Sequence, residues 1–274
     1  MKKKAFEHFM AFITWTAAII TVCTLLFLVG FILVKGIPHI KPSLFSLTYN
    51  SENVSLMPAL ISTVLMTLLS LVIAVPLGVF AAIYLTEYAR RGNKAVGIIR
   101  ITTETLAGIP SIVYGLFGLL FFVTVLGWGF SMLAGAFTLS IMILPLIIRS
   151  SEEALKAVSD AYREGAFGLG AGKLRTVFRI VLPSAMPGVL AGVILAIGRI
   201  TGETAALIYT AGTVAQIPTN PLHSARTLSV HMYTLSREGL HMDAAYATAV
   251  VLLTIVVLIN TISARIAKRV GSKA

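Results

Sequence analysis

Two charged side chains, Arg199 and Glu203, stand inside an otherwise apolar stretch and are the first candidates for chemistry. They lie four residues apart, so we expect both on one face of a single helix. Holding either charge near the centre of a bilayer costs about 2.5–3.5 kcal/mol, and Arg before Glu is the weaker order for local helix support. Together with Thr201 and Thr204, these two charged residues indicate a polar substrate path in which Arg199 presents a positive charge to an anion. The alternative is a structural ion pair that holds helices together.

No segment of the chain fits a nucleotide-binding loop. Residues 167–173 end in Gly-Lys as a phosphate-binding loop does, but Phe167 stands where the first glycine of such a loop belongs. Leu174 replaces the Ser or Thr that would bind magnesium, and no strand precedes the segment. We therefore expect no ATP hydrolysis by this chain and no catalytic residues.

The histidines and the single cysteine do not indicate a metal or cofactor site. His223, His231 and His241 are spaced by 8 and 10 residues, which matches no ligand motif, so we expect them to be solvated or interfacial. Cys23 lies in an apolar run, and one cysteine can form neither a disulfide framework nor a metal cluster. We expect neither a metal nor a cofactor.

Composition places the chain in a membrane. Of its 274 residues 57% are hydrophobic and only 12% are charged, about half the charged share of a soluble domain. Long apolar runs predict an all-α protein with six transmembrane helices, over about 10–34, 58–84, 103–126, 129–148, 187–211 and 244–264. Pro110 is expected to kink the third helix. Gly198 and Gly202 in the fifth have the spacing that lets another helix approach closely.

Positive charge divides unevenly between the segments that flank these helices. The N-terminus, the 85–102 and 149–186 loops and the C-terminal tail hold 17 Lys and Arg residues, whereas the two loops opposite hold 4. The positive-inside rule therefore places both termini and the 149–186 loop in the cytoplasm. The net charge of +11 thus reports topology and not a nucleic-acid surface. We expect three regions: 1–57 with the first helix and an external loop, a transmembrane domain over 58–264, and a basic tail over 265–274.

The longest polar interruption between the apolar runs covers residues 164–183. Its sequence predicts a helix capped by Ser159 or Asp160, because their side-chain oxygens accept hydrogen bonds from free N–H groups. Gly170 and Gly172 can stop that helix in a left-handed turn. A second, amphipathic helix follows, and the proline that ends the segment is expected to break it before the next apolar run.

This segment resembles the cytoplasmic EAA loop of ABC-importer permeases, whose pattern is E-A-A, three residues, a glycine, nine residues and I-x-L-P. The matching positions are Glu164, Gly165, Ala166, Gly170, Ile180, Leu182 and Pro183. Gly165 is the one departure, a glycine where the pattern has its first alanine. The resemblance implies the type I importer permease fold and a coupling helix that docks on a separate ATPase subunit. A basic amphipathic loop on the membrane surface is the alternative.

The fifth helix extends the resemblance. Residues 198–207, GRITGETAAL, resemble the R-x-x-G-E-T-A signature of phosphate-importer permeases, and the chain length resembles the PstA-type subunit. This implies a subunit that moves inorganic phosphate across the cytoplasmic membrane of a bacterium or archaeon. It also implies a PstC-type second permease, a PstB-type ATP-binding dimer and a PstS-type external phosphate-binding protein. Membrane lipid surrounds such a subunit, and nucleic acid is not a partner.

Other functions stay open at this point. A permease for another oxyanion, such as molybdate or sulfate, is the nearest alternative. A passive channel or carrier would explain six spans and buried charges but not the EAA spacing. A membrane enzyme would need a paired base and nucleophile or a metal cluster, and the sequence shows neither.

Overall fold

The computed structural model describes residues 2–90 and 92–271, and all regular structure within them is helical. Met1, Arg91 of the basic loop, and 272–274 of the expected tail lie outside the described residues. In chain order the elements are α1 (Lys2–Gly36), the short 3-10 helices η1 (Ile37–His39) and η2 (Pro42–Phe45), α2 (Met57–Ile83), the π-helical turn η3 (Tyr84–Tyr88), α3 (Lys94–Ala107), α4 (Ser111–Gly118), the π-helical η4 (Leu119–Val125), α5 (Met132–Lys156), α6 (Asp160–Gly168), α7 (Lys173–Thr176), the π-helical η5 (Val177–Val181), α8 (Leu182–Gly202), α9 (Ala205–Thr210), α10 (Leu228–Glu238) and α11 (Met242–Gly271).

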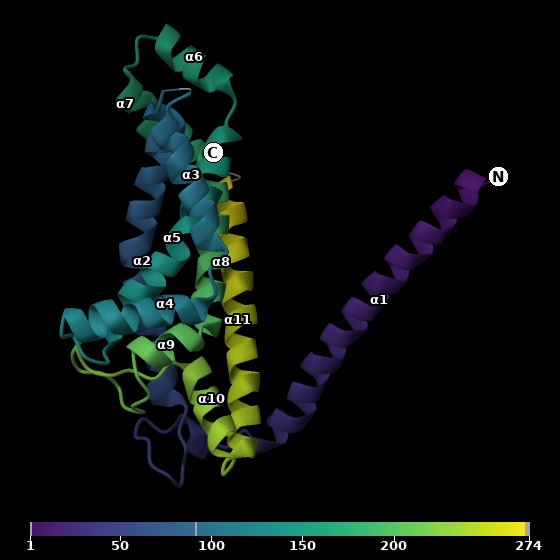
Figure 1. The fold of residues 1–274 in the computed structure, drawn as a ribbon, viewed down its shortest axis with the longest axis vertical. Helices are drawn as coiled ribbons and strands as arrows, with labels where there is room; N and C mark the ends of the chain where they lie inside the picture. The colour runs from purple at the N-terminus through teal and green to yellow at the C-terminus, as the bar shows by residue number, and fades with distance from the viewer. Residues whose placement is uncertain (1, 91, 272–274) are drawn as a thin grey trace.

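Five helical segments of the described chain are long and apolar enough to cross a membrane, and a bent pair of helices can supply a sixth. The predicted all-α, six-span organisation is confirmed in this form. Figure 1 shows the long helices α2, α5, α8 and α11 side by side, with α6 and α7 at one end of the bundle and α10 at the other.

The third span is broken, whereas the sequence predicted one kinked helix over 103–126. α3 already begins at Lys94, inside the expected basic loop, and the helix after it turns by 101°. Pro110 stands at the N-cap of α4 in an extended conformation, with ψ 141°. Proline has no N–H and disfavours helical backbone at the residue before it, so the turn falls at this point. α4 therefore runs across the bundle (Figure 1).

The core is built where α2, α5 and α8 meet. Its buried side chains include Met66 of α2, Met142 and Ile147 of α5, and Ala196 and Ile200 of α8. Burial of such side chains stabilises a folded bundle by dispersion and close packing more than by the hydrophobic effect, because lipid tails are as apolar as they are. This core fixes the axis of α8, the helix that carries Arg199.

The close approach to α8 occurs at other glycines than those predicted. A Cβ on Gly192 would lie 1.8 Å from the Ser150 Oγ, so α5 and α8 pack with almost no space between them there. At Gly202 a Cβ would meet nothing within 4 Å, and at Gly198 it would reach only Asn260 Oδ1 at 3.9 Å. Within the described residues no helix comes as close at those two positions as α5 does at Gly192, so a close helix approach at Gly198 and Gly202 stays a prediction.

Helix α1 leaves the bundle. Most of it belongs to a 34-residue apolar segment, Phe6–His39, and none of the most apolar window of that segment is buried. Its C-terminal end alone packs on α11: a Cβ on Gly36 would lie 2.4 Å from the Tyr246 carbonyl oxygen, and Phe31 meets the Tyr246 ring edge to face. Figure 1 shows the rest of α1 diverging from the other helices.

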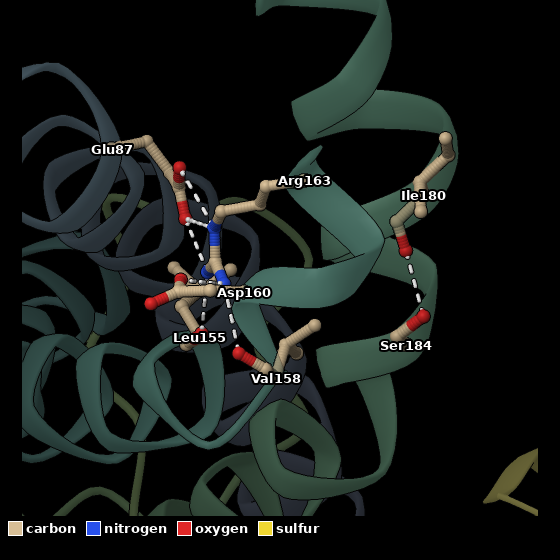
Figure 2. A network of polar contacts seen from close by, with 7 residues as sticks. All are labelled: Glu87, Leu155, Val158, Asp160, Arg163, Ile180 and Ser184. Atoms are coloured by element: carbon tan, nitrogen blue, oxygen red, sulfur yellow. Dashed lines mark hydrogen bonds and ion pairs between the residues drawn. The ribbon is translucent and has the colours of Figure 1, made fainter. Parts of the chain in front are cut away.

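The expected 149–186 loop is mostly helical. α5 continues to Lys156, and α7, η5 and α8 form one helical segment over Lys173–Gly202, so Pro183 does not end the second helix as predicted. The π-helical turn η5 ends at Val181, two residues before Pro183. Proline removes one hydrogen bond of the helical ladder, and the wider π turn absorbs that interruption. Ser184 then donates from its Oγ to the Ile180 carbonyl at 2.8 Å (Figure 2).

Candidate functional site

Glu203 does not share a helical face with Arg199. α8 ends at Gly202, and Glu203 is extended, with φ −72° and ψ 129°. The Glu203 Oε1 accepts a hydrogen bond from the backbone N–H of Ala206 at 3.0 Å, and its own carbonyl accepts one from Ser229 Oγ at 2.6 Å. A carboxylate at a helix start compensates the free N–H groups there, and this local bond competes with continuation of α8. The expectation of one helix carrying both charges is therefore wrong.

Arg199 stands in the last turn of α8 and lines a cavity of about 410 Å³ between α3, α5 and α8. The ion pairs found among the described residues do not include Arg199. Other charged residues line the same cavity: Arg100, Glu104, Arg149, Glu152, Glu153 and Lys156. With Arg199 the lining carries four cations and three carboxylates, so the cavity has an excess of positive charge.

The other charges of this cavity are largely paired with one another. Glu152, with only 10% of its side chain exposed, pairs with Arg100 of α3 and with Lys156 at 2.7 Å. Arg149 pairs with Glu153 at 3.1 Å, one helical turn along α5. Sequence reasoning missed this network; the signal it could have used is the i, i+4 spacing of both α5 pairs.

The remaining two predicted path residues face elsewhere. Thr201 is buried, donates to the Ile197 carbonyl at 2.8 Å and borders an apolar cavity of about 460 Å³. Thr204 lines a third cavity, of about 640 Å³, that also touches Arg237. The structure thus brings neither threonine into the cavity of Arg199.

The EAA-loop residues divide between a buried side and an exposed side. Glu164 and Gly165 on α6 are exposed, and Ala166 is buried. Gly170 has a φ of +80°, which confirms the predicted left-handed stop, while Gly172 has a φ of −72° and begins the next helix. The cap at Ser159 is confirmed as well, because its side chain accepts from the Ala161 N–H. At the end of the loop Ile180 and Leu182 are half-buried and Pro183 is exposed.

Arg163, next to the EAA sequence, makes contacts that sequence reasoning missed. Its Nη2 lies 2.7 Å from Oε1 of Glu87, which follows α2 (Figure 2). The hydrogen bond to Glu87, and then the charge of that carboxylate, raise the pKa of the Arg163 guanidinium above its ordinary value. The two residues are 76 positions apart, and nothing in their local sequence indicates the contact.

His231 is fully buried in α10, although the sequence predicted a solvated or interfacial histidine. Its ring meets Tyr49 edge to face at 6.0 Å, and Arg226 Nη1 lies 3.3 Å from its Nδ1. Burial, with a smaller effect of the Arg226 charge, lowers the pKa of His231 to about 4. This histidine is therefore neutral at pH 7 and packs α10 against the 35–57 segment. No group of His, Cys, Asp and Glu in the described part of the chain is placed to hold a metal ion.

Comparison with known proteins finds a matching family model and several similar permeases. A family model described as "Binding-protein-dependent transport system inner membrane component" matches residues 74–273. The chain is 38% identical over 189 residues to a probable ABC transporter permease, YqgI of Bacillus subtilis, covering 64% of each chain and so slightly under two thirds of that relative. It is 34% identical over 259 residues to the phosphate transport system permease protein PstA 2 of Mycobacterium tuberculosis, covering 90% of this chain and 85% of the relative.

Two solved structures share the fold. A chain of a bacterial alginate ABC transporter superposes with a TM-score of 0.67 at 16% identity, covering 94% of this chain and 95% of that one. A chain of the MetNI methionine ABC transporter in an inward-facing conformation gives a TM-score of 0.61 at 22% identity, covering 78% and 94%. These likenesses confirm the predicted type I importer permease fold.

The chain is thus a multi-pass membrane permease of the ABC-importer class. It belongs to the family of binding-protein-dependent transport system inner membrane components. Permeases of this family work with an ATPase and a substrate-binding protein.

Proposed function

We propose that this chain is a permease subunit of an ATP-driven importer of inorganic phosphate. Its partners would be a PstC-type second permease, a PstB-type ATPase dimer and a PstS-type external binding protein. The names of its PstA relatives support the substrate, as does the R-x-x-G-E-T-A sequence that begins at Arg199.

The observation that carries the proposal is the cavity of Arg199. An arginine fork matches the geometry of phosphate oxygens, and Arg199 has no carboxylate partner among the described residues. The paired cations of the same cavity raise the positive potential around it, while its three carboxylates limit how tightly an anion is held. A transport site must release its ion, so a balanced lining of this kind suits passage.

The other residues that were expected to line the substrate path with Arg199 do not contact phosphate in this proposal. Glu203 supports Arg199 by fixing the point where α8 ends, through its bond to the Ala206 N–H. Thr201 and Thr204, which line other cavities, are not part of the proposed contact with phosphate.

Coupling to ATP would run through the EAA loop. Exposed apolar side chains on α6 and beyond it, Phe167 and Leu169 among them, can dock on an ATPase subunit, since this permease would have no nucleotide site of its own. The helical segment Lys173–Gly202 runs without interruption from that loop to the turn that holds Arg199. A stiff helix transmits a displacement at one end to the other, so a movement of the docking loop would also move the anion site. In this proposal the loop and both termini face the cytoplasm of a bacterium or archaeon.

The test is ATP-dependent uptake of radioactive phosphate by proteoliposomes that contain the whole complex. Arg199→Met is expected to lower uptake about tenfold or more, the effect of losing one charge-assisted bond in passage, and Arg199→Lys to retain part of it. Arg265→Met, at an exposed arginine of α11, is the matched control. Normal uptake by Arg199→Met would refute the role of this cavity. Uptake without ATP would favour a passive carrier, and stronger competition by molybdate or sulfate than by phosphate would change the substrate.

A further inference from the structure

The guanidinium of Arg163 joins three segments of the chain at the cytoplasmic end proposed above. Its Nε and Nη2 approach the Glu87 carboxylate at 3.2 and 2.7 Å, and Nη1 approaches Asp160 Oδ1 at 3.0 Å. Nη1 and Nη2 also donate to the carbonyls of Val158 and Leu155 at 2.8 and 3.0 Å. Figure 2 shows this arrangement, with Arg163 on α6 reaching the end of α5 and the turn that follows α2.

The contact with Glu87 is shielded from water, whereas the Asp160 side chain is 79% exposed. Only 15% of the Arg163 side chain and 8% of the Glu87 side chain are exposed. The Leu155 carbonyl lies in the last turn of α5 and the Val158 carbonyl two residues beyond its end, where carbonyls lack the donor that a continuing helix would supply. Removing one member of such a pair leaves the other charge buried and uncompensated, so the contact is costly to open.

The rest of α6 is weakly attached to the bundle. Of its nine residues only Ala166 is buried, and its first turn is held by the exposed cap at Ser159. Arg163 is therefore the principal polar link between α6 and the end of α2 within the described chain. The chain itself gives α6 two further links: residues 157–159 join it to α5, and Gly170 leads from it to the Lys173–Gly202 segment.

We propose that the Arg163–Glu87 pair positions the coupling helix, so that a movement of α6 is imposed on α2 as well as on α5 and α8, to which the chain already joins α6. This inference rests on the proposed coupling role of the EAA loop and adds a positioning residue outside the EAA positions. α2 forms one packed core with α5 and α8, so a displacement that reached only α5 and α8 through the chain would strain that core, whereas the pair makes α2 move with them.

The first experiment measures ATPase activity of the reconstituted complex with and without binding protein at saturating phosphate. Arg163→Met and Glu87→Gln are expected to keep assembly and basal ATPase activity but to lower the stimulation ratio about fivefold or more. Arg163→Lys, which keeps the charge without the fork, is expected to fall between them and wild type. Arg90→Met removes a nearby exposed cation and should leave the ratio unchanged. A wild-type ratio in both Arg163→Met and Glu87→Gln would overturn the proposal, as would an equal loss of basal and stimulated activity.

The second experiment does not depend on which anion is carried, so it separates this inference from the proposed substrate. Spin labels at the exposed positions Tyr84 and Tyr162, in a Cys23→Ala background, report the distance between the end of α2 and α6. The distance should be the same with and without a non-hydrolysable ATP analogue. When the labelled protein also carries Glu87→Gln, the distance between the two labels should change on binding of the nucleotide analogue. A nucleotide-dependent distance in the complex with the intact pair, or none in the Glu87→Gln complex, would refute the proposal even where phosphate transport is confirmed.

Discussion

The carboxylate of Glu203 caps α9: its Oε1 accepts a hydrogen bond from the backbone N–H of Ala206 at 3.0 Å. The same residue is 9% exposed and ends α8 in an extended conformation. The sequence alone suggests that Glu203 is a charge partner of Arg199. In the structure its carboxylate is instead held by a backbone N–H of the next helix. Glu203 therefore stabilises the start of α9, so the effect of substituting Glu203 can be separated from the effect of substituting Arg199.

Glu203→Gln should preserve most phosphate uptake, because the amide oxygen can still accept from the Ala206 N–H. Glu203→Leu cannot accept that bond and should lower the unfolding free energy by about 1 kcal/mol, the usual value of a cap. Thermal unfolding of the purified complex and uptake per assembled complex are the two measurements. Loss of uptake in Glu203→Gln as severe as in Arg199→Met would show that the carboxylate charge acts on the anion, and the capping role alone would then be insufficient.

Acid should destabilise the protein through His231. Its pKa is about 4 in the folded state against an ordinary value of 6.5 for a histidine in an unfolded chain, so between these values the unfolded chain binds the extra proton. Stability from this group is complete above pH 6.5 and is lost as the pH falls towards 4. At pH 5 the loss is about 2 kcal/mol. We expect the melting temperature to fall from pH 7 to pH 5, and His231→Asn, although less stable at pH 7, to show a smaller fall. An equal fall in both proteins would contradict the assignment.

Local chemistry was sufficient to predict the parts of this molecule that depend on neighbouring residues. The Ser159 cap and the left-handed stop at Gly170 follow from side-chain and backbone preferences over a few residues, and both are found. The apolar runs likewise predict the helical fold. Each of these features is decided within one or two turns of chain, where the sequence itself supplies the interacting partners.

The features that sequence reasoning missed depend on tertiary contacts or on competing local bonds. Glu87 and Arg163 meet only because α2 and α5 end at the same side of the bundle. Burial of His231 depends on Tyr49, which lies far earlier in the chain. Pro183 gave the wrong prediction for a different reason: a π-helical turn before it lets the helix continue, and no simple periodicity signals that turn.

The orientation in the membrane is a prediction from charge and can be tested by cysteine labelling. In a Cys23→Ala background, an impermeant reagent applied to sealed cells should label cysteines at positions 51 and 224 but not at 173. Figure 1 agrees with this pairing, because α7, which begins at Lys173, and α10, which follows Ser224, lie at opposite ends of the bundle. Labelling at position 173 from outside, with position 224 protected, would show that the topology is the opposite of the predicted one. It would also remove the basis for cytoplasmic docking of α6.

The two glycines that flank the turn between α6 and α7 offer a matched pair of substitutions. Gly170 has a φ of +80°, where a Cβ costs about 1–2 kcal/mol, whereas Gly172 has an ordinary φ of −72°. A Cβ at either position would meet nothing within 4 Å, so the two substitutions differ in backbone strain and not in packing within the chain.

We therefore expect Gly170→Ala to shift the turn and to lower stimulation of ATPase activity by the binding protein several-fold, at unchanged assembly. Gly172→Ala should behave as wild type, and Glu164→Lys, which reverses an exposed charge on α6, should impair stimulation without affecting the melting temperature. If Gly170→Ala and Gly172→Ala reduce stimulation equally, contact of the loop surface with the ATPase decides the effect. Backbone conformation at Gly170 would then have no special part in coupling.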